Sequence, residues 1–467
     1  MAATQQGGFR LAMITLILIE ALSSFEHVMI IAALPFISRA FGLASAGWVV
    51  TSFLLVQASS AAIGARLGDM YGRERVLAVI LVLTTTGSLI SAFGGSIHFV
   101  IVGRCLQGLS GANLALCYGI ARQMVPAKRL PFWVGALTGG VTLAAAFGYI
   151  LGGYLADLGS WRLIFWFAAG YGAIVLPLLL VTVPRLGNAP PMGGVDWLGG
   201  VLLPLGVAGI LYAVTSSVTQ GGRGPWIAGA GVAGVVLLLW WWGHEWRRPD
   251  PLIQVRLLTQ RPVLIANLCF AIAALGIMQF PLVLIQYLQQ PASSGAGLGL
   301  SATAAGWIKL PSNVGSLLAA MLAGWLCGRH GGRPVIQYGG LLAALSLGSF
   351  PFFHSNPWQI MAITIGGAAG MTTLLAAVPN VVLAHVQPER AGEATGLTMT
   401  VLRVFTAAGA QLVTLSLAAS ATPALAGGRA YPTEFGYTVI LAGIALSGVL
   451  IVLVAQLGTG AARPRRT

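Results

Sequence analysis

The chain has 467 residues, of which 57% are hydrophobic and only 8% are charged. A surface that faces water normally carries about a quarter charged residues, so this composition excludes an ordinary soluble protein. A formal charge of +14 would suit nucleic-acid binding in a soluble chain, but here the basic residues stand in short segments between apolar runs. We therefore expect an all-α integral membrane protein whose partner is the lipid bilayer and not a nucleic acid.

Apolar runs long enough to cross about 30 Å of hydrocarbon recur along the whole chain. The first is expected to be a retained span and not a signal peptide, because it contains Glu20 and Glu26 and reaches Leu34-Pro35 without a small-residue cleavage site. Fourteen spans are predicted, at residues 11–34, 46–67, 76–95, 99–124, 132–155, 161–183, 198–218, 225–243, 262–288, 303–327, 335–353, 358–385, 394–418 and 435–457.

Basic residues are distributed unequally between the two sets of connecting segments. If the amino terminus is cytoplasmic, the inner loops and tails hold 18 of the 25 Lys and Arg, the outer loops hold four, and three lie inside spans. Lys and Arg are enriched in cytoplasmic loops of membrane proteins. The chain is therefore predicted to be a multi-pass protein of the inner (plasma) membrane with both termini cytoplasmic.

An internal repeat relates the segments 64–73 and 324–333 at a constant offset of 260. Two six-helix halves related in this way are typical of transporters, with the substrate site between them. We predict a first six-helix half at 1–190, an inserted helix pair with a cytoplasmic linker at 191–250, and a second half at 251–467. The coinciding pairs are Gly64 and Gly324, Gly68 and Gly328, Gly72 and Gly332, and Arg73 and Arg333.

The segment 64–75, GARLGDMYGRER, resembles the loop motif of the major facilitator superfamily. An ordinary basic loop would explain its arginines but not Asp69 within that glycine spacing. The resemblance implies a major facilitator fold with fourteen transmembrane helices, and a cytoplasmic gate held by Asp69, Arg73 and Arg104. The gate residues implied are Gly64, Gly68, Asp69, Gly72 and Arg73 of the first half and Gly328, Arg329 and Arg333 of the second.

Two further motifs resemble the same superfamily. Span four contains Arg104 in an R-x-x-x-G pattern, and span five contains a glycine-rich segment that resembles the antiporter motif. This segment departs from the family pattern at Tyr149, where the family has proline, which puts the direction and coupling of transport in question. The antiporter-motif residues are Gly140, Gly148, Tyr149, Gly152 and Gly153.

Span one ends in a segment that resembles the fourteen-spanner drug:proton antiporter branch of the superfamily. In that branch an aspartate precedes Ala-Leu-Pro by seven residues, and Glu26 holds that position before Ala33 here. A charged residue at mid-membrane costs about 3 kcal/mol on insertion scales, so Glu20 and Glu26 should face the protein interior and be protonated for part of a transport cycle. Glu26 is the first candidate for proton coupling or cation binding, and Glu20 the second.

At 100° per residue, Glu20, Ser24 and His27 share one face of span one, and Glu26 lies about 120° from Glu20. We expect one glutamate to line the cavity and the other to pack against a neighbouring helix. His27 is either a proton relay or a polar residue hydrogen-bonded between helices.

Two basic residues of the second half are also candidates. Lys309 has three interpretations: an anchor for an anionic substrate, a counter-charge for a glutamate, or a side chain that extends to the outer surface. Arg403 is a candidate substrate contact or a residue that positions a helix. The remaining cavity candidates are Gln57, Asn113, Gln279, Gln286 and Asn313, although polar residues between membrane helices also serve only in packing.

The sequence contains no P-loop, so ATP is not expected to drive transport, and no cofactor is expected. The four cysteines lack the spacing of metal ligands, and no Ser/His/Asp constellation indicates an enzyme. The resemblance implies export of small lipophilic, cationic molecules in exchange for protons by alternating access. The alternatives are an exporter or importer of a dedicated metabolite, including an anionic one, on the same fold, and a membrane sensor that does not transport.

Overall fold

The computed structural model describes residues 2–126, 129–185, 195–219, 224–249, 251–354, 356–387, 390–422 and 430–457, and helices account for nearly all of them. Each of the fourteen predicted spans is helical. Thirteen helical segments in this part of the chain are long and apolar enough to cross a membrane, and α13, with 17 residues, covers the remaining span. The predicted all-α membrane fold is therefore confirmed.

Six spans form the first bundle, and the fourth span is broken by a short 3-10 turn. Its elements are α1 (Ala2–Phe41), α2 (Leu43–Tyr71), α3 (Arg73–Phe93), α4 (Ile97–Gly108), η1 (Leu109–Ala112), α5 (Asn113–Met124), α6 (Leu130–Asp157) and α7 (Arg162–Thr182).

An inserted pair of helices, α8 (Trp197–Thr219) and α9 (Pro225–Arg247), precedes the second bundle. In the second bundle the first span is interrupted at Gly276 and continues as η3 and α11. Its elements are η2 (Val255–Thr259), α10 (Arg261–Leu275), η3 (Ile277–Gln279), α11 (Phe280–Gln289), η4 (Ala292–Ser294), α12 (Ala302–His330), α13 (Gly332–Gly348), α14 (Pro357–Ala384), α15 (Ala391–Ala419), β1 (Ala421–Thr422), β2 (Tyr431–Pro432) and α16 (Glu434–Gln456).

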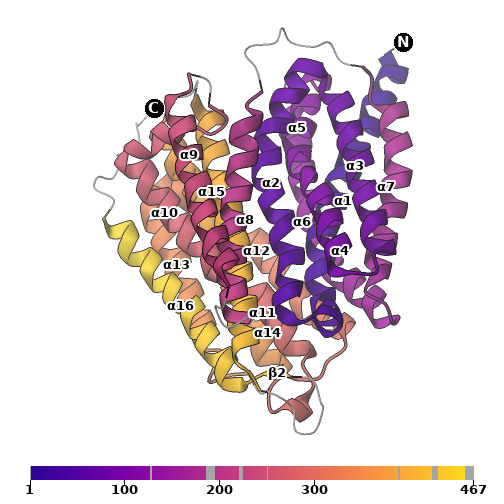
Figure 1. Ribbon diagram of the computed structural model, residues 1–467. Helices are drawn as coiled ribbons and strands as arrows, with labels where there is room; N and C mark the ends of the chain where they lie inside the picture. The colour runs from indigo at the N-terminus through magenta and orange to yellow at the C-terminus, as the bar shows by residue number, and fades with distance from the viewer. Residues whose placement is uncertain are drawn as a thin grey trace.

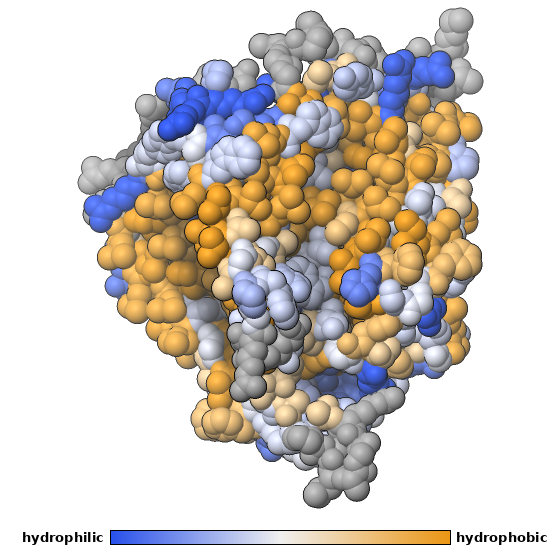
Figure 2. Space-filling model, viewed as in Figure 1, coloured by the Kyte–Doolittle hydropathy of each residue, from blue (hydrophilic) through white to orange (hydrophobic). Residues whose placement is uncertain are grey.

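The two ends of the bundle differ in what they contain. The start of α1 and the end of α16 lie at one end, which we call the terminal face (Figure 1). The antiparallel pair β1–β2, in which Ala421 pairs with Pro432, lies at the opposite end, which we call the hairpin face. Between the two faces, Figure 2 shows a broad apolar belt, and side chains such as Ile174 and Val181 of α7 are 71% and 84% exposed. Such a belt suits contact with lipid.

Glycines let neighbouring helices approach closely. A Cβ at Gly103 of α4 would collide with the backbone of Gly87 in α3, and a Cβ at Gly448 of α16 would lie 2.6 Å from the carbonyl oxygen of Gly340 in α13. Small residues at helix contacts are how membrane helices pack without a hydrophobic driving force between them. The high glycine content of the chain therefore reflects packing.

Two sequence-based helix boundaries and the register of the repeat were wrong. Helix α1 continues past Pro35 to Phe41, where span one was expected to end at residue 34. The motif from Gly64 onward was expected to be a loop but is the last part of α2, and the turn itself is confined to Gly72, with φ at 99°.

The third correction concerns the repeat. Helices α2 and α12 are both 29 residues long and start 259 residues apart, and the turn glycine after α12 is Gly331, with φ at 83°. The turn of the second half therefore matches Gly72 at an offset of 259, and Gly332 is the first residue of α13. We match Gly72 with Gly331 because both have a positive φ angle, which only glycine adopts readily.

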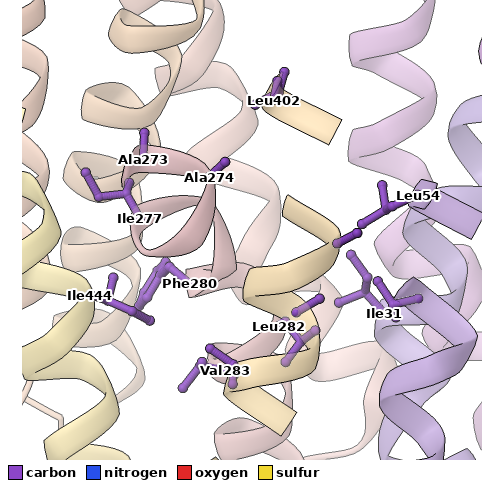
Figure 3. Close-up of a cluster of buried hydrophobic side chains, with 14 of the residues drawn as sticks. Ile31, Leu54, Ala273, Ala274, Ile277, Phe280, Leu282, Val283, Leu402 and Ile444 are labelled. Carbon is purple, nitrogen blue, oxygen red and sulfur yellow. The ribbon is translucent and has the colours of Figure 1, made fainter. Parts of the chain in front are cut away.

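Two hydrophobic clusters make up the core. The larger extends across both bundles, and Figure 3 shows Ile31 of α1, Leu54 of α2 and Leu282 of α11 within it. The smaller is confined to the first bundle and includes Met13, near the terminal end of α1, and Ile120 of α5. The two bundles thus share a core that includes the hairpin-side parts of α1 and α2.

Candidate functional site

Glu26 lies inside the first bundle, where α1, α2 and α4 meet. Its side chain is 4% exposed, and both carboxyl oxygens are buried without a hydrogen-bond partner of normal geometry among the described residues. The guanidinium of Arg104 interacts with it electrostatically, and Ser88 is nearby. A buried carboxylate without hydrogen bonds is costly, so this position favours a neutral acid or a close cation.

Arg104 itself is fully buried and fixed by the backbone of two other helices. Its Nε donates to the carbonyl of Val49 at 2.9 Å, and one terminal nitrogen donates to the backbone carbonyl of Glu26 and to Gln107 Oε1, both at 2.8 Å. The guanidinium carbon lies 4.1 Å from the centre of the Phe53 ring. Arg104 therefore ties α4 to α1 and α2 and supplies the positive charge beside Glu26.

His27 stacks on the same Phe53 ring that Arg104 contacts. Its ring centroid lies 5.7 Å from that of Phe53, and its Nδ1 has no hydrogen-bond partner among the described residues. Arg403 of α15 and Arg104 both act on it electrostatically. The structure thus brings four of the candidate residues from sequence, Glu26, His27, Arg104 and Arg403, into one neighbourhood.

Glu20 occupies a different environment. It is 4% exposed and lies against Cys117 of α5, and its Oε1 has no hydrogen-bond partner in the described part of the chain. Ser24, on the same predicted face of α1, donates to the carbonyl of Val141 in α6 at 3.1 Å. Glu20 and Glu26 thus face different helices, which agrees with the wide angle expected between them.

Lys309 lies at the contact between the two bundles. It is 3% exposed, its ammonium nitrogen donates to Ser312 Oγ at 2.6 Å, and the same nitrogen lies 5.7 Å from the ring centre of Tyr149 in α6. Its side chain therefore does not extend to the surface of the bundle. The tyrosine that replaces the motif proline contacts the one buried lysine of the described second bundle.

The glycine-rich motif of α6 packs against two helices. A Cβ at Gly140 or Gly152 would meet Ile17 or Met29 of α1, and Gly148 also faces α1. On the other side, a Cβ at Gly153 would collide with the backbone of Ala302 at the start of α12. The helix itself is unbroken through the motif. The motif thus holds α6 between the two bundles.

The predicted gate residues lie at the terminal face, within their own bundles. Asp69 pairs with Arg73 at 2.7 Å, and Arg73 also donates to the carbonyl of Gly119 in α5 at 3.1 Å. In the second bundle, Arg333 donates to the carbonyl of Gln456 at 2.8 Å, and the guanidinium of Arg329 lies 5.3 Å from the Trp325 ring centre.

Two gate expectations need revision. Arg104 was expected to hold the gate with Asp69 and Arg73, but it is bonded to Val49 and Glu26 instead. The glycines of the motif also differ between the halves. A Cβ at Gly68 would collide with Leu116, whereas one at Gly328 would meet nothing within 4 Å.

The polar cavity candidates fall into two groups. Gln279 donates to the carbonyl of Thr406 at 3.1 Å and stands at the break between α10 and α11, which is a structural role. The others each have one buried polar atom without a partner among the described residues, as expected of groups that meet water or a ligand. These atoms are Gln57 Oε1, Asn113 Oδ1, Gln286 Nε2 and Asn313 Nδ2.

Asp157, at the last turn of α6, was not among the residues predicted from sequence. Its carboxylate accepts hydrogen bonds from the backbone nitrogens of Ala302 at 3.0 Å and Thr303 at 2.8 Å, and from Thr303 Oγ1 at 2.6 Å. It thus caps the N-terminus of α12, a helix of the other bundle, where negative charge is favoured. Gln289 adds a second link between bundles by donating to the carbonyl of Ala32 at 2.9 Å.

Gln411 of α15 was also missed, and it joins three parts of the fold. Its Oε1 accepts from Thr51 Oγ1 of α2 at 3.2 Å, and its Nε2 donates to Thr215 Oγ1 of α8 at 2.9 Å. Helix α8 lies beside α2 and α15 (Figure 1). Glutamine within a span is a visible signal for a buried contact, but the sequence does not show which helices it joins.

The family model of the Major Facilitator Superfamily matches residues 16–410. The chain belongs to the Major Facilitator Superfamily. The superfamily comprises membrane transporters, and this chain has the helical multi-pass fold of that family. The similarity over nearly the whole fold agrees with the resemblance that the loop motif at 64–75 indicated.

Curated members of the superfamily are similar over much of the chain. The "Multidrug resistance protein B homolog" of Mycobacterium tuberculosis is 28% identical over 69% of this chain and 59% of its own length. The "Probable actinorhodin transporter" of Streptomyces coelicolor is 28% identical over 79% of this chain and 65% of its own length. The chain thus spans about three fifths of the relatives that it matches.

A solved peptide transporter, POT in complex with sulfate, has the same major facilitator fold. It superposes with a TM-score of 0.68 over 96% of both chains, at 16% sequence identity. At this identity the likeness concerns the fold only. It agrees with the arrangement of two related bundles.

Proposed function

We propose that this chain exports small lipophilic, cationic molecules in exchange for protons by alternating access. The observation that carries the proposal is Glu26, an acid of α1 beside the cation of Arg104. Its two carboxyl oxygens are buried without a hydrogen-bond partner of normal geometry among the described residues. Such an acid is costly to ionise unless its surroundings change, so release of its proton is coupled to a change of conformation or to the arrival of a cation.

The contacts between the bundles support the alternating-access part of the proposal. Asp157, Gln289 and Gln411 all join the two bundles on the hairpin side. Toward the terminal face, a Cβ at Gly135 or Gly139 of α6, or at Gly324 of α12, would meet nothing within 4 Å. We infer a conformation closed at the hairpin face, in which the bundles are less tightly packed at the terminal face.

The orientation follows from the basic residues. The sequence assigns 18 of the 25 Lys and Arg to segments on the side of the amino terminus. We therefore place the protein in the inner (plasma) membrane with the terminal face toward the cytoplasm. Proton entry from the hairpin face would then reach Glu26, with Glu20 as a second acid on the path. Asp69 and Arg73, with Arg329 and Arg333, would close the cytoplasmic gate in the opposite conformation.

The names of the curated relatives also support export. Those reported above are called a multidrug resistance protein and an actinorhodin transporter. The first name refers to drug resistance and the second to transport of actinorhodin. We extend transport of organic molecules to this chain and propose that its direction is outward.

Efflux from proteoliposomes tests the proposal directly. When a proton gradient is imposed, the wild type should move a fluorescent lipophilic cation in the direction opposite to proton flow. Collapse of the gradient by a protonophore should stop this movement. Glu26→Gln should lose gradient-driven efflux while still exchanging labelled substrate across the membrane, because the amide cannot release a proton. Glu434→Gln is the control, because Glu434 is an acid at the hairpin face outside α1 that pairs with His354. Glu20→Gln tests the second acid separately. Efflux that persists after collapse of the gradient, or in Glu26→Gln, would contradict proton coupling at Glu26.

Lys309 favours a second candidate, transport of an anionic metabolite on the same fold. Its buried ammonium lies at the contact of the bundles with Ser312 as its hydrogen-bond partner among the described residues. A buried cation of this kind would bind a carboxylate or phosphate well. If the wild type moves organic anions and not cations, and Lys309→Gln abolishes this, the second candidate replaces the first. A protein inactive toward broad panels of both kinds would instead favour a sensor that does not transport.

A further inference from the structure

A pocket opens at the C-terminal end of α9, at the terminal face and away from the contact between the bundles. Its volume is about 520 Å³. Helix α9 is the outer member of the inserted pair, and little of it is buried inside the protein. The lining residues are Leu239, Trp240, Gly243, His244, Arg247 and Arg248.

The missing side chain of Gly243 makes room in the pocket. A Cβ at this position would meet nothing within 4 Å. Leu239 and Trp240 form an apolar wall beside it and are 67% and 55% exposed. The same exposed surface continues along α9 through Val236 and Val232, which are 54% and 64% exposed. One end of the pocket therefore leads onto a long apolar strip.

The other end of the pocket is cationic on its outward side. Arg247 is exposed there. His244 and Arg248 are turned toward Asp196. Its Oδ1 lies 3.0 Å from His244 Nε2 and 3.5 Å from a terminal nitrogen of Arg248. Two acids of the described chain lie nearby, Asp196 and Glu245, and they are only 3% and 0% exposed. Their carboxylates lie against Gly199 at the start of α8, so they face the protein interior. The acids thus point inward while Arg247 points outward.

This arrangement lies at the boundary between the apolar belt and the polar surface. Figure 2 shows strongly hydrophilic residues gathered along the terminal edge of this side, directly above apolar surface. We propose that the pocket binds an anionic phospholipid of the surrounding bilayer. Its headgroup phosphate would pair with Arg247, and an acyl chain would lie along Leu239 and Val236. Basic pockets of this kind at a membrane surface select anionic headgroups. The proposal does not depend on what the protein transports.

Lipid titration of the full-length protein tests it. The purified protein, depleted of lipid in mild detergent, is titrated with phosphatidylglycerol or phosphatidylcholine, and bound lipid is counted by native mass spectrometry. Arg247→Gln removes the charge, and Gly243→Leu fills the pocket. Matched controls are Arg75→Gln, an exposed arginine at the terminal face on α3, and Gly229→Leu, a glycine of the same helix whose Cβ would also meet open space.

One tightly bound phosphatidylglycerol is expected in the wild type, with phosphatidylcholine weaker. Loss of one surface arginine should weaken binding about fivefold, since each contributes about 1 kcal/mol toward an anionic lipid. Gly243→Leu should weaken it as well, and both controls should bind as the wild type does. Equal binding of the two lipids, or unchanged binding in both pocket variants, would overturn the proposal. Displacement of the lipid by millimolar inorganic phosphate would also overturn it, because the site would then recognise a free anion.

Discussion

The carboxylate of Asp157 and the first turn of α12 at Thr303 join the two bundles at the hairpin face. Asp157 Oδ2 accepts from both the backbone nitrogen and the hydroxyl of Thr303, at 2.8 Å and 2.6 Å. A helix N-terminus of one bundle is thus capped by an acid of the other. Because charge-assisted hydrogen bonds are stronger than neutral ones, this contact should stabilise the conformation closed at the hairpin face.

Asp157→Asn should open the hairpin face more often. The amide loses the charge and one of the two acceptor oxygens, which should cost about 1–2 kcal/mol and raise the open fraction roughly five- to thirtyfold. A cysteine introduced at Ala305, which is fully buried in α12, reports opening by its rate of labelling with a hydrophilic maleimide. The native cysteines are replaced beforehand.

Glu434→Gln is the control for this experiment. Glu434 is an acid of the same face, but its partner His354, at 3.1 Å, belongs to the same bundle. Its loss should leave the labelling rate at Ala305 unchanged. A rate in Asp157→Asn equal to that of the wild type would show that the contact does not govern opening.

Gly153→Val should destabilise the protein far more than Gly139→Val. Both glycines lie in α6, but a side chain at Gly153 would collide with the backbone of Ala302, while one at Gly139 meets open space. Overpacking against backbone typically costs about 1–3 kcal/mol. The thermal unfolding temperature of the purified protein, followed by tryptophan fluorescence, should fall clearly for the first variant and little for the second. Similar falls in both would contradict the close contact between α6 and α12.

Arg104→Met should be among the most damaging single substitutions. It leaves the carbonyl of Val49, the backbone carbonyl of Glu26 and Gln107 Oε1 without their donor, and it leaves the Glu26 acid without its cation. Breaking a buried charged network by removing one partner costs about 3–5 kcal/mol. Denaturant unfolding in mixed micelles measures the loss.

Two further variants separate charge from geometry at Arg104. Arg104→Lys keeps the charge, but its N–H donors all lie on one nitrogen and cannot replace both Nε and the terminal nitrogen of Arg104. Its stability should therefore lie between those of the wild type and Arg104→Met. Adding Glu26→Gln to Arg104→Met should recover part of the loss, because no charge is then left unpaired. If the double variant is no more stable than Arg104→Met, the electrostatic link between the two residues is negligible.

Gln411 and Thr215 should show a measurable coupling energy in a double-mutant cycle. Their hydrogen bond, at 2.9 Å, attaches the inserted pair to the second bundle. Such bonds in membrane proteins contribute about 0.6 kcal/mol on average, and we expect a coupling of this size between Gln411→Leu and Thr215→Val. Thr219→Val is the comparison, because Thr219 bonds only within α8 among the described contacts. Equal coupling of Gln411 to both threonines would contradict the predicted attachment.

The sequence by itself determined the fold class, the fourteen spans and the family. These depend on properties that short stretches carry alone: apolar length decides whether a segment crosses a membrane, and the motif at Gly64 to Arg73 is contiguous. The wide angle between Glu20 and Glu26 was also predictable, because both lie on one helix with a fixed turn per residue. Their roles in transport stay predictions.

Only the tertiary structure decided which helices these residues meet. Arg104 was placed with Asp69 on sequence grounds, yet its length and direction on α4 bring it to Val49 and Glu26. Asp157 gave no local sign of a role, because its partner at Thr303 lies 146 residues away. Contacts between helices depend on how whole helices cross. Small residues such as Gly153 and Gly306 allow a close crossing by packing directly against the backbone of the neighbouring helix. The sequence shows these glycines but not which helix they meet.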